Sequence, residues 1–282
     1  MKLSSVNGTL LKLSFVLVFL TQNYAQSILS SFDFSKSDIT KLPGQLREIS
    51  GLTTTKEGKL FAHNDEKGIV YEVDFEKGSI VKSFIVGKKL LYEDFEDIAT
   101  VNNRFFLLAS NGTIYEFIEK SDGEYSDFIK YNTPFSSKFD FEGLCFDPQT
   151  GSLLIASKKY PGKNYNGSRT VFSFDLDKNQ FLIEPRFIIP LNGIKKKYGI
   201  NNFSPTGIEY NLKSKTFLII SSDQKSIIEV SADGKILNGI ILPSADHIQP
   251  EGITFNGVGD LLISDEGKNK KGRITRYKVT DK

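Results

Sequence analysis

Acidic residues recur at matching positions along the chain, and they are the side chains whose spacing could do chemistry. Glu96, Glu142 and Glu251 each stand directly before a small residue that is followed by Ile or Leu. Carboxylates that are brought together repel one another, so they must take up protons or share a cation. Ca²⁺ is a hard cation that accepts roughly six to eight oxygen ligands. These residues therefore predict a Ca²⁺ site if the fold brings them together.

The small residue after each acid marks an internal repeat. The anchor positions are Gly51, Asp97, Gly143, Gly207 and Gly252, with successive spacings of 46, 46, 64 and 45 residues. Within each unit, short β-branched or aromatic runs are bounded by Gly, Asn and Asp, as strands are bounded by turns. Units of roughly 40–50 residues with four short strands are typical of propeller blades. We expect an all-β protein, a five-bladed β-propeller of four-stranded blades.

The last repeat holds three strand patterns before the chain ends, and an extra strand pattern at residues 28–34 precedes the first repeat. We expect this N-terminal strand to complete the last blade, because closing the ring removes an open sheet edge. The long spacing between the third and fourth anchors comes from two insertions, residues 158–168 and 192–203, with a helical turn predicted at 194–198.

In a propeller the innermost strand begins on the face where the next, antiparallel strand ends. Glu48 stands at the start of such an innermost strand and Asp65 at the end of the second strand of the same blade. Both could join Glu96, Glu142 and Glu251 as metal ligands at one mouth of the central channel. The alternative is that these acids cap backbone amides of neighbouring blades, or pair with Arg47 and nearby Lys.

The chain divides into two regions. Residues 1–25 hold Lys2 and Lys12, a short apolar run and Ala25, a pattern typical of a secretory signal peptide, with an uncleaved N-terminal anchor as the alternative. Residues 26–282 form the expected propeller domain. The chain has 36 Lys and Arg against 34 Asp and Glu, so removing the two N-terminal Lys leaves a net charge near zero. A neutral domain gives no general attraction to nucleic acid or anionic lipid.

Catalytic residues are not identifiable in the sequence, which leaves an enzyme and a binding protein as alternatives. The chain has no Gly-x-Ser-x-Gly elbow and no phosphate-binding glycine loop. His63 beside Asp65 is the one His expected near the mouth, as a polar rim residue or as a catalytic base. The single Cys145 cannot form an internal disulfide and is expected to be a buried, inert thiol.

The repeated motifs resemble the bacterial SdiA-regulated family, also called YjiK-like. The segments that carry the resemblance are Glu48–Leu52, His63–Glu66, Asp94–Ile98, Asp140–Leu144 and Gln249–Ile253. The resemblance implies a five-bladed propeller of the cell envelope with bound Ca²⁺ and no established enzyme activity. It also implies a distant relation to phytase-like and esterase-like propellers. Thr206 replaces the acid in the fourth repeat, which makes any metal site asymmetric.

Two functions follow as expectations. The first is a non-enzymatic Ca²⁺-binding envelope protein that binds a small-molecule or protein ligand at the acidic channel mouth. The second is a Ca²⁺-dependent hydrolase, either a phosphoesterase, an esterase or a lactonase, which would need a metal-bound water or a general base beside its substrate. A protein secreted across the inner membrane would lie in the periplasm or cell envelope, with peripheral attachment to the cell membrane as one possibility.

Overall fold

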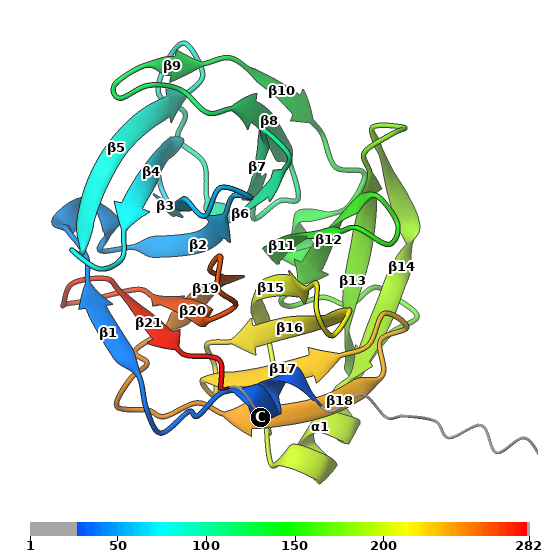
Figure 1. The fold of residues 1–282 in the computed structure, drawn as a ribbon. Coiled ribbons are helices and arrows are strands. Elements are labelled where there is room, and N and C mark those ends of the chain that lie inside the picture. The colour runs from blue at the N-terminus through cyan, green and yellow to red at the C-terminus, as the bar shows by residue number, and fades with distance from the viewer. Residues whose placement is uncertain (1–26, 281–282) are drawn as a thin grey trace, which may run out of the picture.

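Five sheets, each built on four antiparallel strands, surround a central axis in the computed structural model, which describes residues 27–280 (Figure 1). The prediction of an all-β, five-bladed propeller is confirmed. The predicted signal peptide or anchor at residues 1–25 lies outside the described residues. Within them, no helix has the length and apolarity that a membrane span requires.

The strands of the first three blades follow the chain from the axis outward. Blade one comprises β2 (Ile49–Thr54), β3 (Leu60–Asn64), β4 (Ile69–Asp74) and β5 (Ser79–Val86). Blade two comprises β6 (Phe95–Val101), β7 (Arg104–Ala109), β8 (Ile114–Ile118) and β10 (Phe128–Tyr131). Blade three comprises β11 (Phe141–Asp147), β12 (Ser152–Ser157), β13 (Ser168–Asp175) and β14 (Gln180–Pro190). The short β9 (Tyr125–Ser126) pairs in parallel with β5 and widens the first sheet to five strands.

The last two blades contain the helix and the closure of the ring. Helix α1 (Leu191–Tyr198) covers the predicted helical turn and leads into blade four. Blade four comprises β15 (Pro205–Asn211), β16 (Thr216–Ser221), β17 (Ser226–Val230) and β18 (Ile236–Ile241). Blade five comprises β19 (Pro250–Phe255), β20 (Leu261–Asp265), β21 (Arg273–Tyr277) and, from the other end of the chain, β1 (Asp38–Lys41).

The N-terminal segment does complete the last blade, but with a different strand from the one predicted. β1 pairs antiparallel with β21 in the register Asp38↔Arg276 to Lys41↔Arg273. Residues Ile28–Ser31 form a 3₁₀ helix, η1, instead of a strand, and Phe32 makes one isolated bridge to Val279. The apolar residues of 28–34 that suggested a strand are explained by packing: Leu29 and Phe32 are buried against blades four and five.

The hydrophobic core is divided among the five interfaces between neighbouring blades. Each of the five core clusters combines residues of two adjacent blades. Successive side chains of a strand point to opposite faces of a sheet, so Phe105 and Leu107 of β7 pack toward blade one while Phe106 and Leu108 pack toward blade three. This explains why the middle strands are continuous apolar runs. Cys145 lies buried at the interface of blades three and four, as predicted.

Candidate functional site

A register irregularity near the start of every innermost strand positions the repeated acids. The pairing to the second strand shifts at Ile49/Leu52, Phe95/Asp97, Phe141/Gly143, Pro205/Gly207 and Pro250/Ile253. Such an irregularity re-aims the side chain at the extra residue. The residues directly before the anchors at these sites are Ser50, Glu96, Glu142, Thr206 and Glu251. Three of the five blades therefore present a carboxylate at the same level of the channel.

Glu96, Glu142 and Glu251 lie close enough to influence one another, and Lys158 lies among them. We call these four residues the acidic mouth. The Lys158 ammonium pairs with Glu142 Oε1, and the Lys158 backbone N–H donates to Asp140 O at 2.8 Å. Burial lowers the pKa of Lys158, but the charges of Glu142, Glu251 and Glu96 outweigh burial and raise it above its ordinary value.

Burial and mutual repulsion hold protons on the carboxyl groups of the acidic mouth. Burial raises the pKa of Glu251 to about 8, with a further contribution from Glu142. The pKa of Glu96 is raised by burial and by the charges of Glu142 and Asp94. Burial also raises the pKa of Glu142, which the Lys158 ammonium opposes. With all three carboxyl groups ionised, the site would have more negative charge than one ammonium can neutralise, so it takes up protons or a cation.

One oxygen of the acidic mouth has no partner. Glu142 is 4% exposed, and its Oε2 has no hydrogen bond while Oε1 is held by Lys158. A buried polar atom that stays unpaired costs on the order of 1–3 kcal/mol, and more when it is charged. This free oxygen belongs to the carboxylate whose charge, in addition to burial, raises the pKa of both Glu96 and Glu251, and it is the feature of the site that most directly favours a cationic ligand.

Glu48 and Asp65, the other two predicted ligands, belong to a neighbouring group that also contains Glu66 and Glu266; we call these four residues the side cluster. Asp65 Oδ1 is buried without a hydrogen bond, and burial together with the charge of Glu48 raises the pKa of Asp65 to about 6. Glu48 pairs with Arg47 at 2.7 Å, which is the pairing considered as the alternative to metal binding.

Gln249 connects the two groups of acids. Its side-chain Nε2 donates to Glu251 Oε1 at 2.6 Å and to Glu266 Oε2. The five predicted ligands therefore divide into three in the acidic mouth and two in the side cluster, joined through one amide. Lys158 and Gln249 were not predicted as site residues. The repeat could have indicated Gln249, because it occupies the position of Glu48, Asp94 and Asp140 in its own blade.

The donor chemistry of the acidic mouth fits Ca²⁺, since all three acids offer oxygen and one buried oxygen is free. The side chains are placed for the Lys158 ion pair, however. Among the described residues, no group of three or more His, Cys, Asp or Glu side chains is arranged to hold a metal ion. A metal ion bound here would require Lys158 to withdraw. Lys158 stands just after β12 and its side chain keeps 26% of its surface exposed, so it has an outlet to solvent.

His63 is neither a rim residue nor a base for a substrate, contrary to the two expectations. It is fully buried; Nε2 accepts from the Gly51 N–H at 3.1 Å, and Nδ1 lies 2.9 Å from the Asn64 carbonyl oxygen. Burial lowers its pKa to about 4, so the ring is neutral at physiological pH. His63 therefore provides a hydrogen-bond acceptor for a backbone N–H where the pairing of β2 with β3 is irregular.

Asp97 occupies the anchor position that is Gly in the other four repeats. Its Oδ1 accepts from the Ile98 N–H at 2.8 Å, and its Oδ2 accepts from the Leu144 N–H at 2.7 Å, which ties blade two to blade three. A Cβ added to Gly51 would lie 2.5 Å from Asp97 Oδ1, so the side chain fills space that the glycine leaves free. Burial raises the pKa of Asp97 well above its ordinary value.

The second histidine belongs to a fully buried network in blade five. His247 Nδ1 lies 2.8 Å from Asp265 Oδ2, and His247 Nε2 lies 2.8 Å from the Tyr277 hydroxyl. Asp265 also accepts from the backbone N–H groups of Ile248 and Gln249. None of the three side chains is exposed, so this His–Asp–Tyr chain positions the segment before β19 and has no route to a substrate.

The fold and the site define a five-bladed β-propeller with carboxylates at one mouth of its channel. The family model described as SdiA-regulated matches residues 185–282, from the outer strand of blade three through blades four and five. The resemblance proposed from the motifs is therefore confirmed over these residues, which include Glu251.

Solved structures support the architecture. Glutaminyl cyclase from Myxococcus xanthus has 12% sequence identity and a TM-score of 0.56, over 86% of this chain and 96% of that chain. At this identity the likeness concerns the fold alone. Virginiamycin B lyase from Staphylococcus aureus has 14% identity over 86% of this chain and 88% of that chain. Its TM-score of 0.48 is too low to support the fold assignment.

Proposed function

We propose that this protein is a non-enzymatic Ca²⁺-binding β-propeller of the cell envelope, of the SdiA-regulated type along its whole length. In this proposal the acidic mouth binds Ca²⁺ and presents it to a small-molecule or protein ligand. The observation that carries the proposal is the Glu142 carboxylate, which is 4% exposed with Oε2 unpartnered beside two further glutamates.

Glu96, Glu142 and Glu251 would hold the ion, with Glu48 and Asp65 of the side cluster as the remaining predicted ligands. The bound ion would supply positive charge that attracts anionic groups of a ligand to the mouth. The residues of the chain do the rest: Lys158 withdraws from Glu142, the glutamates give up their protons, and Gln249 keeps Glu251 in place through its 2.6 Å hydrogen bond. Since metal ligands must be deprotonated, Ca²⁺ binding releases protons.

Calorimetry and thermal unfolding, with Ca²⁺ and with a chelator, test the proposal. A ligand at a hundredfold excess over its Kd stabilises the folded state by ~2.7 kcal/mol, so Ca²⁺ should raise the melting temperature and the chelator should reverse the effect. Glu142→Gln should weaken Ca²⁺ binding by tenfold or more. Glu184→Gln, an exposed site on the outer strand β14, is the matched control. Equal Ca²⁺ responses of the two variants, or no response at all, would contradict the proposal.

A Ca²⁺-dependent hydrolase is the second candidate, and one observation favours it. Asp65 has a pKa raised to about 6 and an oxygen without a hydrogen bond, and a carboxylate with a pKa near neutrality suits a general base. A screen of phosphate esters, carboxyl esters and lactones, with and without Ca²⁺, separates the candidates. Ca²⁺-dependent turnover that Asp65→Asn abolishes would establish the hydrolase; Ca²⁺ binding without turnover supports the binding protein.

A further inference from the structure

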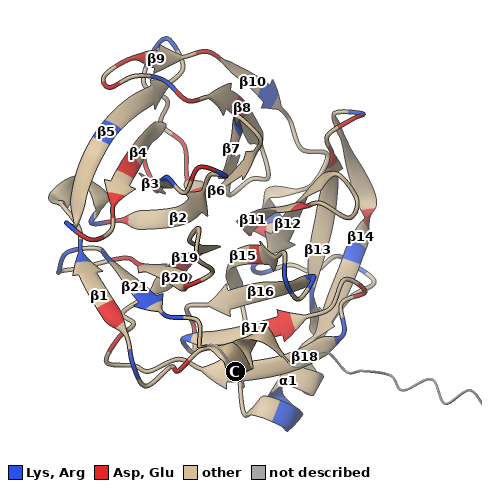
Figure 2. Ribbon diagram, viewed as in Figure 1, with Lys and Arg blue, Asp and Glu red and all other residues tan. Residues whose placement is uncertain are grey.

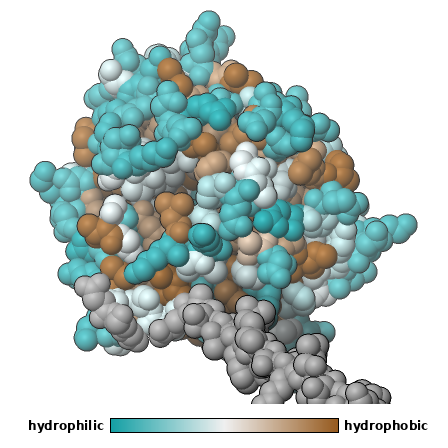
Figure 3. Space-filling view, turned by 45° about the vertical axis from the view of Figure 1, so that its right-hand side comes forward, coloured by the Kyte–Doolittle hydropathy of each residue, from teal (hydrophilic) through white to brown (hydrophobic). Residues whose placement is uncertain are grey.

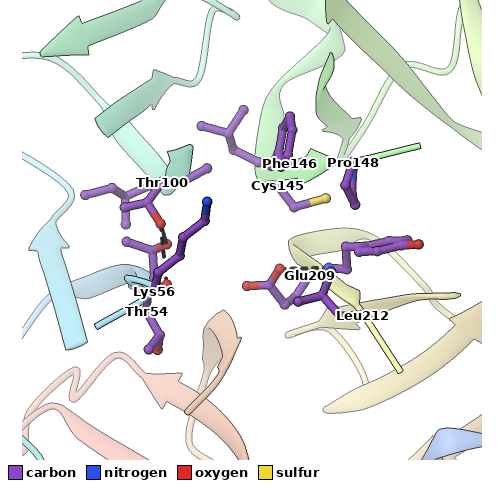
Figure 4. Close-up of a pocket in the computed structure, with 13 residues that line it drawn as sticks. Thr54, Lys56, Thr100, Cys145, Phe146, Pro148, Glu209 and Leu212 are labelled. Atoms are coloured by element: carbon purple, nitrogen blue, oxygen red, sulfur yellow. Dashed lines mark hydrogen bonds between the residues drawn. The ribbon is translucent and has the colours of Figure 1, made fainter. Parts of the chain in front are cut away.

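A cavity opens at the other end of the innermost strands, opposite the acidic mouth. It has a volume of about 300 Å³ and lies between β2, β6, β11 and β15 (Figure 4). The acidic mouth uses the residues before the anchors, whereas this cavity is lined by residues after them. Asp97 lies buried between the two levels and bonds across from blade two to blade three. The cavity is therefore a site separate from the proposed metal centre. We call it the distal pocket.

The walls of the distal pocket differ in chemistry. On one side Thr100 lies near Thr54, and the Thr100 hydroxyl is 3.2 Å from that of Thr53 (Figure 4). The opposite side is apolar, with Leu144, Phe146 and Leu212 among its residues. Leu212 is 76% exposed, which is high for a leucine in a folded domain. A concave surface with a broad apolar wall and a few fixed polar groups is typical of small-molecule sites.

Glu209 is the fixed charged group of this pocket. It is half-buried and its carboxylate points into the cavity (Figure 4). Oε1 accepts from the Tyr210 N–H at 2.8 Å and Oε2 accepts from the Thr254 hydroxyl at 3.0 Å. An ionised carboxylate has about four acceptor positions, so acceptor capacity remains. No described Lys or Arg forms an ion pair with Glu209. Burial raises its pKa to about 7, as expected for a carboxyl group that lacks a cationic partner.

Lys56 is the other charged side chain of the pocket, and it is engaged elsewhere. Its Nζ donates to Asn102 Oδ1 at 2.7 Å, and the residue is exposed. An exposed, strongly hydrated ammonium on a flexible stem contributes little to binding an anion. The polar preference of the pocket is therefore set by Glu209, which is held in place by two hydrogen bonds.

We propose that the distal pocket binds a small molecule that carries a protonated amine next to an apolar group. The amine donates to the Glu209 carboxylate, and the apolar group packs against Leu144, Phe146 and Leu212. Hydrogen bonds to a charged group are stronger than those between neutral groups, so Glu209 should account for at least a tenfold preference for the amine over a neutral or acidic analogue. This site adds a second ligand to the protein and does not depend on Ca²⁺ at the acidic mouth.

The chain contains no tryptophan, so a single fluorophore can report on this pocket. Leu212→Trp places one at the exposed rim, where the substitution should not disturb the core. Phenethylamine is the probe, and 3-phenylpropionate is the analogue of opposite charge. We expect a saturable fluorescence change with phenethylamine and at least tenfold weaker binding of 3-phenylpropionate. Adding Glu209→Gln to Leu212→Trp should weaken phenethylamine binding at least tenfold, because the amide keeps the shape and loses the charge.

A second measurement covers the case in which the tryptophan obstructs the pocket. Calorimetry follows phenethylamine binding to the unchanged protein and to Glu209→Gln, both without the tryptophan. Glu184→Gln, at an exposed position of the outer strand β14, is the control and should leave phenethylamine binding unchanged, with or without Ca²⁺. The proposal is overturned if the amine fails to bind the unchanged protein. It is also overturned if the acid binds as well as the amine, or if Glu209→Gln binds phenethylamine like the parent.

Discussion

At the scale of single residues, the chemistry of the channel is set by the few positions at which one repeat carries a different residue type from the others. Asp97 replaces glycine and bonds across to blade three, Thr206 replaces an acid, and Lys158 places an ammonium among three glutamates. The Thr206 hydroxyl donates to Pro250 O at 2.8 Å, so in blade four this position makes a structural hydrogen bond to blade five. The five blades share one architecture, but the axis that they surround is chemically asymmetric.

Lys158 should compete with Ca²⁺ for Glu142. Lys158→Met removes the ammonium, and we expect Ca²⁺ affinity to rise at least tenfold, about 1.4 kcal/mol. In the absence of Ca²⁺ the same variant should be less stable than the parent, because the buried Glu142 carboxylate loses the ion pair that it makes with Lys158. Lys159→Met is the matched control, since Lys159 pairs at 2.8 Å with Asp140 and its side chain is 71% exposed. Calorimetric titration of both variants decides the point; similar affinities would argue against competition.

Glu209 should make stability depend on pH. Its pKa is about 7 in the folded protein and about 4.3 in an unfolded chain. The folded state then holds the proton more tightly, so the stability that Glu209 contributes is full below pH 4 and is lost as pH rises through 7. Glu209→Gln should match the parent near pH 4 and exceed it at pH 8 by at most about 4 kcal/mol. Denaturant unfolding at the two pH values measures this, and a constant difference between the proteins would refute it.

At the scale of elements, the ring depends on β1, a short strand from the far end of the chain. β1 pairs with β21 in antiparallel register, and Leu42 N–H continues the contact by donating to Gly272 O at 2.8 Å. The Arg276 side chain strengthens this edge through Asp38 at 2.8 Å and through Glu76 of blade one. Without β1, the outer edge of blade five would offer unpaired backbone groups.

Two truncations separate the role of β1 from that of the segment before it. Deleting residues up to 36 removes η1 and the buried Leu29, so we expect lower thermal stability with the blade still closed. Deleting residues up to 41 also removes β1, so we expect aggregation in addition, because the edge of β21 becomes free to pair with other chains. Size-exclusion chromatography and thermal unfolding compare the two. Identical behaviour of both truncated proteins would show that β1 does not protect the edge.

At the scale of the whole molecule, the surface carries no dominant charge. Lys and Arg are interspersed with Asp and Glu over the blades (Figure 2), and hydrophilic side chains cover most of the face in Figure 3, with apolar residues scattered among them. The near-zero net charge of residues 26–282 thus conceals local groups of like sign, of which the acidic mouth and the side cluster lie at the channel.

The N-terminal region should be removed during export. If residues 1–25 are a secretory signal, N-terminal sequencing of the envelope protein should begin near Gln26. The folded domain should tolerate this, because η1 at Ile28–Ser31 is the first element of the described chain. A mature protein that still begins at Met1 would favour the N-terminal anchor.

The amino-acid sequence by itself determined the architecture. Anchors spaced at 46, 46 and 45 residues, together with strand patterns between them, predict five blades because each blade is a local unit whose strands are neighbours in sequence. The same repeat placed Glu96, Glu142 and Glu251 at one level of the channel, since equivalent positions of equivalent blades face the same axis. The missing strand of the last blade predicted closure by the N-terminal segment.

The tertiary structure alone decided which strand closes the ring and what each acid touches. Residues 28–34 pack apolar side chains into the core between blades four and five, whereas Asp38–Lys41 pair with β21. The Lys158 pair with Glu142, the Gln249 connection and the buried His63 arise between residues whose side-chain directions depend on bulges and loops. The distal pocket likewise joins four blades, each of which supplies three or four lining residues, and whether these residues leave a cavity depends on how the side chains of neighbouring blades pack.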